Sequence, residues 1–185
     1  MEIIDEAKNI VLVGLMGSGK SAIGRTIAKK LGRRFIDTDR LIERKTGKTI
    51  AEIFNSEGEL LFRKQEKDII RKISQYIGIV IATGGGAIKD PENFKCLKES
   101  GWIIALFASP AVLYQRIAGK RIRPLLLDED EPIKKLEEIF NERKSMYSQA
   151  DFQVNTENKE INQIADEIID LLNVNKINNG FDTSI

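Results

Sequence analysis

The chain has 185 residues, a length that suits one domain of ordinary size rather than two. Its 29 Lys and Arg residues balance its 28 Asp and Glu residues, and a formal net charge of +1 gives no overall field that would attract nucleic acid or a membrane surface. There is no histidine and one cysteine, Cys96, so the composition excludes Ser-His-Asp hydrolysis, His-ligated metals and an internal disulfide.

The first apolar run, Ile10–Val13, is typical of a buried strand and leads directly into the octapeptide Gly14–Ser21. Apolar residues then recur at helical spacing, at Ile23, Ile27, Ala28 and Leu31. A strand, a glycine-rich loop and a helix in that order predict a phosphate-binding loop. Its backbone N–H groups and the helix N-terminus would surround the phosphates, Lys20 would reach the β- and γ-phosphates, and the Ser21 hydroxyl suits Mg²⁺.

A second strand-like run opens the segment Phe35–Asp39, which carries the carboxylates Asp37 and Asp39. One could hold Mg²⁺ or its water while the other accepts a substrate hydroxyl, or this segment could simply cap the next helix. No acidic residue ends the runs Ile79–Thr83 and Trp102–Phe107, where motor ATPases carry their metal-binding acid. Asp37 is then the best substitute. No Asn-Lys-x-Asp motif is present, which weighs against a GTPase.

A long helical stretch contains Arg63 and Glu66, which are three residues apart and therefore share one face of the helix. A surface ion pair contributing a few tenths of a kcal/mol is the default expectation for such a pair. The alternative is that the guanidinium binds a carboxylate of another molecule bidentately.

The glycine triplet Gly84–Gly86 directly follows a central strand-like run. Three residues without side chains would let a substrate approach the backbone closely and would expose consecutive N–H donors. Taken alone, the triplet favours a flexible turn.

The segment Arg116–Pro124 carries four positive charges in nine residues and is followed by the acidic run Asp128–Glu131. Closing such a segment over a nucleotide would put cations beside the transferring phosphoryl group and exclude water. Without further information, a solvated surface loop explains the same pattern.

Five apolar runs alternate with amphipathic segments along the whole chain: Ile10–Val13, Phe35–Asp37, Ile79–Thr83, Trp102–Phe107 and Phe152–Val154. This rhythm predicts an α/β protein with a parallel sheet and ligands outside the carboxyl ends of its strands. The last stretch, Asn173–Ile185, is polar and interrupted by glycine, so we expect it to be frayed or disordered.

The longest apolar runs, such as Trp102–Ala108, are too short to span a bilayer, and the segment Met1–Glu6 is not a signal peptide. These features predict a cytoplasmic protein with no membrane partner.

Taken together, these residues resemble the shikimate kinase family. The shared motifs occur in that family's order and approximate spacing, from about Asn9 to Leu172: Gly14–Ser21, Asp37-Thr38-Asp39, Phe54 with Phe62-Arg63, Gly84–Gly86, Arg123–Leu126, and Arg143 with Tyr147.

The resemblance implies a three-layer P-loop kinase fold with a central five-stranded parallel sheet, helices on both faces and a mobile lid. A single domain over 1–175 would contain the lid at about 116–131 and a substrate-binding segment at about 38–66, followed by a disordered tail at 176–185. The implied activity is ATP-dependent, Mg²⁺-assisted phosphorylation of the 3-hydroxyl of shikimate, on the route to aromatic amino acids. We expect a monomer that binds shikimate and ATP and no nucleic acid.

The resemblance also implies how the acceptor would be bound. Arg63 and Arg143 look like the family's carboxylate-binding arginines, and Gly84 and Gly85 would supply backbone contacts. Asp39 matches the family residue that binds the ring hydroxyls and orients or deprotonates the attacking oxygen. In addition, Glu66 would orient Arg63, while Phe54 and Phe62 would wall the ring.

On the nucleotide side, the resemblance implies that the loop residues bind ATP: Gly17, Ser18, Gly19, Lys20, Ser21 and Ala22. Ser21 and Asp37 would hold Mg²⁺, Arg116 would stack on adenine, and Arg123 would stabilise the transition state. Lys20, Asp39 and Arg123 are the expected catalytic residues. Some family members sandwich the base with a proline after the last strand, where this chain has Thr156–Ile161, so those contacts do not transfer.

Two alternatives stay open. One is a related small-molecule kinase, such as a gluconate kinase, against which Arg63, Arg143 and the glycine triplet argue. The other is a nucleotide-binding regulatory protein with an inactive acceptor site, against which the intact Lys20 and Asp39 argue.

Overall fold

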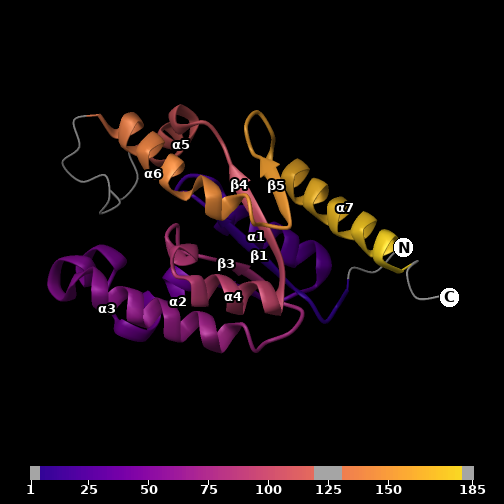
Figure 1. Ribbon diagram of the computed structural model, residues 1–185, viewed down its shortest axis with the longest axis horizontal. Coiled ribbons are helices and arrows are strands. Elements are labelled where there is room, and N and C mark those ends of the chain that lie inside the picture. Colours follow the sequence, from indigo (N-terminus) through magenta and orange to yellow (C-terminus); the bar gives the residue numbers. More distant parts are fainter. Residues whose placement is uncertain (1–4, 119–130, 181–185) are drawn as a thin grey trace.

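The computed structural model describes residues 5–118 and 131–180, with 175–180 as backbone only. At its centre lies a five-stranded parallel sheet in the order β2-β3-β1-β4-β5 (Figure 1). Its strands are β1 (Asn9–Gly14), β2 (Phe35–Asp37), β3 (Val80–Ala82), β4 (Gly101–Phe107) and β5 (Phe152–Asn155). Each expected strand is present, with its bounds within one residue of the apolar run that predicted it. The predicted α/β class and five-stranded parallel sheet are confirmed.

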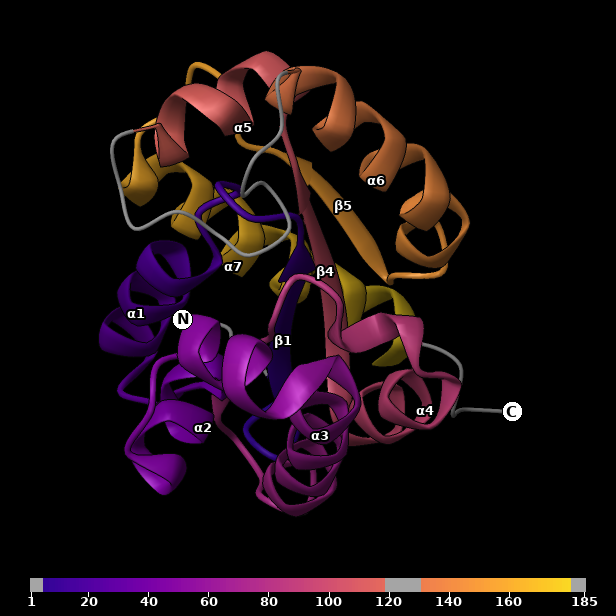
Figure 2. The ribbon, with the colours of Figure 1, turned by 90° about the vertical axis from the view of Figure 1, so that its left-hand side faces the viewer.

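The helices cover both faces of this sheet. They are α1 (Lys20–Leu31), α2 (Thr38–Thr46), α3 (Ile50–Ile73), α4 (Pro91–Ser100), α5 (Pro110–Ile117), α6 (Pro132–Tyr147) and α7 (Ile161–Gly180), with a short 3₁₀ helix, η1 (Ala87–Lys89). Figure 2 shows α5 and α6 together at one end of the molecule and α2, α3 and α4 together at the other. α3 is kinked at Gly58, whose φ of 82° is not helical.

Alternation along β1 explains the three layers. Ile10 and Leu12 point into one core, where they pack with residues of α1 and α7. Val11 and Val13 point into the other core, which is filled from α2 through α6. Because successive side chains of a strand point to opposite faces, an unbroken apolar run is what a strand covered on both sides requires.

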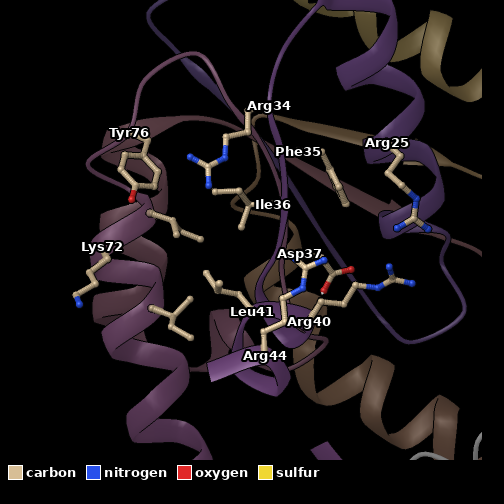
Figure 3. A pocket seen from close by; sticks show the side chains of 12 residues that line it. Arg25, Arg34, Phe35, Ile36, Asp37, Arg40, Leu41, Arg44, Lys72 and Tyr76 are labelled. Carbon is tan, nitrogen blue, oxygen red and sulfur yellow. Dashed lines mark hydrogen bonds between the residues drawn. The ribbon is translucent and has the colours of Figure 1, made fainter. Parts of the chain in front are cut away.

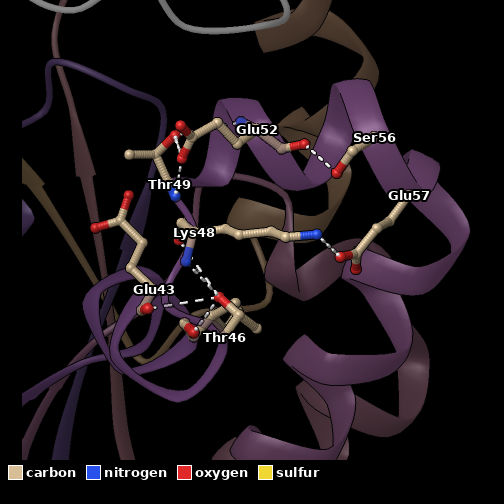
Figure 4. Close-up of polar contacts among 8 residues, drawn as sticks. Glu43, Thr46, Lys48, Thr49, Glu52, Ser56 and Glu57 are labelled. Atoms are coloured by element: carbon tan, nitrogen blue, oxygen red, sulfur yellow. Dashed lines mark hydrogen bonds and ion pairs between the residues drawn. The ribbon is translucent and has the colours of Figure 1, made fainter.

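The connection between α2 and α3 is fixed by polar contacts (Figure 4). Thr49 and Glu52 form a capping box at the start of α3, in which each side chain accepts from the other's backbone N–H. Lys48 forms an ion pair with Glu57, which lies on α3 just before the kink at Gly58. Glu43 on α2 accepts from the backbone N–H of Ile50 at 3.1 Å. The segment expected to bind the acceptor is therefore anchored at its turn.

At the C-terminus, α7 continues to Gly180, into the segment for which the sequence predicts disorder. Residues 181–185 lie outside the described part of the chain, as do residues 119–130 of the expected lid, including Arg123. Within the described ranges, no helix has the length and apolar character needed to cross a membrane.

Candidate active site

The expected phosphate-binding loop joins the end of β1 to the start of α1 and depends on its glycines. Gly14, Gly17 and Gly19 all have positive φ, at 144°, 81° and 93°. A Cβ on Gly14 would lie 2.3 Å from the carbonyl oxygen of Leu106, and one on Gly17 would lie 2.6 Å from that of Leu113. The loop is thus pressed against β4 and α5, and larger residues would displace it.

The N-terminus of α1 opens into this loop without a side-chain cap. Lys20 lies at its first position, with Nζ donating to the carbonyl oxygens of Gly14 at 2.8 Å and Leu15 at 2.9 Å. Ser18 is fully buried, and its Oγ has no hydrogen-bond partner among the described residues. Ala22 follows in the first turn of the helix. An uncapped helix end, a lysine held in the loop and a buried hydroxyl together suit an anion.

Asp37, at the end of β2, serves two purposes at once. Its Oδ2 accepts a hydrogen bond from Ser21 Oγ at 2.5 Å, while its Oδ1 caps α2 by accepting from the backbone N–H of Arg40 at 3.2 Å. Capping, one of the alternatives left open by the sequence, is therefore present, and the contact with Ser21 places the same carboxylate beside the residue expected to bind Mg²⁺. A hydroxyl and a carboxylate oxygen this close are hard ligands that fit Mg²⁺, which takes few protein ligands and keeps waters and phosphate oxygens.

The glycine triplet after β3 is where charged side chains from α2 and α3 converge. The backbone N–H of Gly84 donates to Thr38 Oγ1 at 2.9 Å, and Thr38 is fully buried. A Cβ on Gly84 would lie 2.6 Å from Glu66 Oε1 and 2.7 Å from Asp39 Oδ1. The triplet is therefore fixed in place and packed against carboxylates, not a flexible turn.

Arg63 approaches the same triplet from α3. A Cβ on Gly86 would lie 2.7 Å from its Nη2. Its Nη1 donates to Glu66 Oε2 at 2.7 Å, and its Nε and Nη2 donate to Glu59 Oε1. Burial lowers the pKa of Arg63, but attraction to Glu66 and hydrogen bonds to both carboxylates outweigh it and raise the pKa overall.

The default expectation of an ion pair on the surface between Arg63 and Glu66 is wrong about the location of the pair. The pair forms, but the Glu66 side chain is only 1% exposed, and its Oε1 has no hydrogen-bond partner in the described structure. Burial raises the pKa of Glu66, attraction to Arg63 lowers it and repulsion from Asp39 raises it, with a net increase. Glu66 thus holds the Arg63 guanidinium from within the core.

Arg143 reaches the triplet from the opposite side, on α6. It is 3% exposed, and its Nη1 donates to the carbonyl oxygen of Gly85 at 2.6 Å. Tyr147, one turn later, donates to the same oxygen at 3.4 Å, and burial raises its pKa to about 12. Two arginines from distant helices therefore meet one loop.

The predicted aromatic wall consists of Phe54 and Phe62, on either side of the kink in α3. Their ring centroids are 4.8 Å apart with planes inclined at 46°. Phe62 is 3% exposed and Phe54 is half-buried, so the pair packs onto the core beneath Arg63.

Arg116, at the end of α5, connects the loop to the end of β5. Its guanidinium donates to Thr156 Oγ1 at 2.8 Å, to the Thr156 carbonyl oxygen at 2.6 Å and to the Gly17 carbonyl oxygen at 3.4 Å. Thr156 is fully buried and also bonds Phe107 of β4. Arg116 therefore lies beside the loop, where the resemblance implies that a nucleotide binds.

The shikimate kinase family model matches residues 16–173. A shikimate kinase from Pelotomaculum thermopropionicum is 46% identical over 89% of this chain and 95% of that protein. The shikimate kinase from Acinetobacter baumannii, solved in complex with shikimate, is similar in structure with a TM-score of 0.89 and 38% identity, covering 92% of this chain and 96% of that chain.

The chain belongs to the shikimate kinase family. The resemblance carried by its motifs is confirmed. A gluconokinase from Sinorhizobium meliloti also superposes, with a TM-score of 0.62 and 17% identity over 97% of this chain and 99% of that chain. At that identity the likeness shows the P-loop kinase fold and nothing about the acceptor.

In this member of the shikimate kinase family, three residues make contacts in the site that the sequence did not predict. Thr38 anchors Gly84, Thr156 binds Arg116, and Glu59 binds Arg63. Only Glu59 carries a local signal, because it stands four residues before Arg63 on the same helix. The other two contacts join residues 46 and 40 positions apart, which spacing does not reveal.

Proposed function

We propose that this chain transfers the γ-phosphoryl group of ATP to the 3-hydroxyl of shikimate, with the site at the carboxyl ends of β1, β2 and β3 as its catalytic centre. Membership of the shikimate kinase family makes it an ATP- and Mg²⁺-dependent kinase of aromatic amino-acid biosynthesis. The observation that carries the assignment of residues is the convergence of Arg63, Arg143 and Asp39 on one glycine triplet.

Shikimate is a carboxylate with three ring hydroxyls, so its site needs cations at one end and acceptors at the other. Arg63 and Arg143 bind the carboxylate, supported by their approach to Gly86 and Gly85. A planar guanidinium can donate two parallel bonds to a carboxylate, which fixes direction as well as charge. Glu66 orients Arg63 from its buried position.

Asp39 accepts from the attacking hydroxyl. The new bond forms between the 3-oxygen of shikimate and the γ-phosphorus, the bond from that phosphorus to the leaving ADP oxygen breaks, and the hydroxyl proton passes to the Asp39 carboxylate. A positioned base of this kind typically contributes about 10²–10⁴-fold to the rate. The backbone of Gly84 and Gly85 positions the ring beside this carboxylate.

The loop binds the phosphates through Gly17, Ser18, Gly19 and Ala22. When ATP binds, Lys20 leaves the carbonyl oxygens that it contacts and donates to the β- and γ-phosphate oxygens. There its positive charge stabilises the negative charge of the transferring phosphoryl group. When bound, Mg²⁺ neutralises charge on the β- and γ-phosphate oxygens, and Ser21 and Asp37 hold it or its water.

On the far side of the loop, Arg116 stacks on adenine, a role supported by its bond to Gly17 of the loop. Arg123, in the proposed lid at about 116–131, stabilises the charge that develops on the γ-phosphoryl group. This lid is part of a single domain over 1–175.

For the setting of the reaction we propose a monomer in the cytoplasm that binds neither nucleic acid nor a membrane. The nearly balanced charge supports the absence of binding to nucleic acid and membranes. Size-exclusion chromatography with light scattering tests the oligomeric state.

A coupled ADP-release assay tests the activity and its acceptor. The expected result is turnover with shikimate and none above background with gluconate or nucleoside monophosphates. The Lys20→Ala variant serves as the control, because it keeps the glycine loop but loses the phosphate-directed charge. Turnover with gluconate in place of shikimate, or undiminished turnover in the Lys20→Ala variant, would overturn the assignment.

A further inference from the structure

A second concave site lies on the outer edge of the sheet, away from the glycine triplet. A pocket of about 390 Å³ opens beside β2, between α2 and the C-terminal part of α3 (Figure 3). β2 pairs with β3 alone, so it is an edge strand. The apolar part of the pocket wall comes from both sides of this strand and from the two helices: Phe35, Ile36, Leu41, Ile69 and Ile73.

Five cationic side chains line this pocket: Arg25, Arg34, Arg40, Arg44 and Lys72. The one carboxylate among the lining residues is Asp37, whose oxygens already accept from Ser21 and from the backbone of Arg40. In the described part of the chain, none of the five cations forms an ion pair. By contrast, Lys67, Lys89 and Lys98 all pair with carboxylates elsewhere in the described structure.

Two of these arginines already lie against aromatic rings. Arg25 lies over Phe35, with 5.5 Å from its guanidinium carbon to the ring centroid, and Arg34 lies over Tyr76 at 5.6 Å. The face of an aromatic ring attracts a guanidinium at this distance and leaves its N–H groups able to donate to another partner. The pocket therefore combines apolar walls, arginines that lie against aromatic rings and an excess of positive charge, in a chain whose net charge is only +1.

We propose that the pocket beside β2 binds a small organic anion with a flat apolar body, of the class of aryl phosphates and aryl carboxylates. Its volume is in the range of small-molecule sites. β2 has only three residues and would offer an added peptide strand few backbone hydrogen bonds, so a small molecule fits better than an acidic peptide. The site does not depend on the proposed kinase mechanism, since none of the five cations has a role in it.

The test is isothermal titration calorimetry, in which phenyl phosphate is added to the full chain. Saturating Mg²⁺, ADP and shikimate are present to fill the catalytic site. Inorganic phosphate, which has the charge without the ring, is titrated in parallel. The expected result is one binding site for phenyl phosphate, with a dissociation constant at least about tenfold lower than that of inorganic phosphate, because the ring is removed from water.

Two double variants with the same loss of charge separate the pocket from general surface charge. The double variant Arg44→Gln, Lys72→Gln removes two lining cations. Its dissociation constant for phenyl phosphate should be at least about fivefold higher than that of the parent. Lys45→Gln with Arg71→Gln removes the neighbouring cation on each of the same helices, and neither residue lines the pocket. This control should bind as the parent does. Equal affinity for phenyl phosphate and inorganic phosphate, equal losses in both variants, or no binding would overturn the proposal.

Discussion

Arg63 donates to a single oxygen of Glu59 from two nitrogens, Nε at 3.2 Å and Nη2 at 3.0 Å. The Glu59 side chain is 55% exposed. It accepts hydrogen bonds from the guanidinium that we propose binds the carboxylate of shikimate. An internal carboxylate therefore competes with the substrate for the same donors.

Glu59→Gln should tighten shikimate binding, because it removes the competing charge and keeps the size of the side chain. Exposed pairs contribute about 0.2–1 kcal/mol, so the dissociation constant should fall by roughly 1.5- to 5-fold. Titration of each variant with shikimate measures this dissociation constant. The charge-matched control is Glu137→Gln, a change at an exposed position on α6. Weaker binding in the Glu59→Gln variant would show that Glu59 orients Arg63 for the substrate instead of competing with it.

The buried carboxylate of Glu66 predicts a pH dependence of stability. Its pKa is raised in the folded state by burial, so at pH values between the unfolded and the folded pKa the folded chain binds more protons at this residue than the unfolded chain does. Its contribution to the free energy of unfolding should therefore fall as pH rises from about 4.5 through its folded pKa. Urea unfolding at several pH values should show that the stability of the parent relative to the Glu66→Gln variant decreases as pH rises. Asp68→Asn, an exposed change on α3, is the control, and a relative stability that increases with pH would contradict the prediction.

Gly84 and Gly85 differ in the space available to a side chain, although they are neighbours. A methyl group at Gly84 would lie within 2.7 Å of two carboxylate oxygens, whereas the nearest atom to one at Gly85 is the Met16 backbone nitrogen at 3.6 Å. Gly84→Ala should lower the free energy of unfolding by about 1–3 kcal/mol, the usual cost of overpacking. Gly85→Ala should stay within about 0.5 kcal/mol of the parent. Equal unfolding midpoints for the two variants would mean that the packing against Glu66 and Asp39 is looser than described.

Asp39→Asn keeps the shape of the side chain and removes the charge that accepts the hydroxyl proton. We expect kcat to fall by at least about tenfold, with a small change in the KM for ATP. Steady-state kinetics measures both, and thermal unfolding shows whether the fold is kept. A variant that loses stability but keeps kcat once folded would assign Asp39 to the start of α2 and not to catalysis.

The inner strands could be predicted because they are buried on both faces and are therefore continuous apolar runs, as Ile10–Val13 is. The edge strands β2 and β5 are only partly buried, and their short runs were predicted from the βα rhythm of the chain. The sequence also predicted that Asp37, Gly84 and the phosphate loop lie close together. They follow parallel strands, and the carboxyl ends of parallel strands lie at one edge of the sheet. Helical spacing placed Arg63 and Glu66 on one face, but it contains no information on what covers that face.

Contacts between distant segments could not be predicted from the chain. The bond from Arg143 to Gly85 joins residues 58 positions apart, and that from Arg116 to Thr156 joins residues 40 apart.

The most direct test of the account is a comparison of shikimate and ATP affinities in the Arg143→Ala variant. Arg143 is buried and reaches the triplet from its own helix, so its loss should leave the phosphate loop intact. Removing a charged hydrogen-bond donor costs about 1.5–3 kcal/mol, which predicts a shikimate dissociation constant raised by at least about tenfold and an ATP dissociation constant changed by less than about twofold. Equal losses of affinity for both ligands would show that Arg143 is structural and that the acceptor site lies elsewhere.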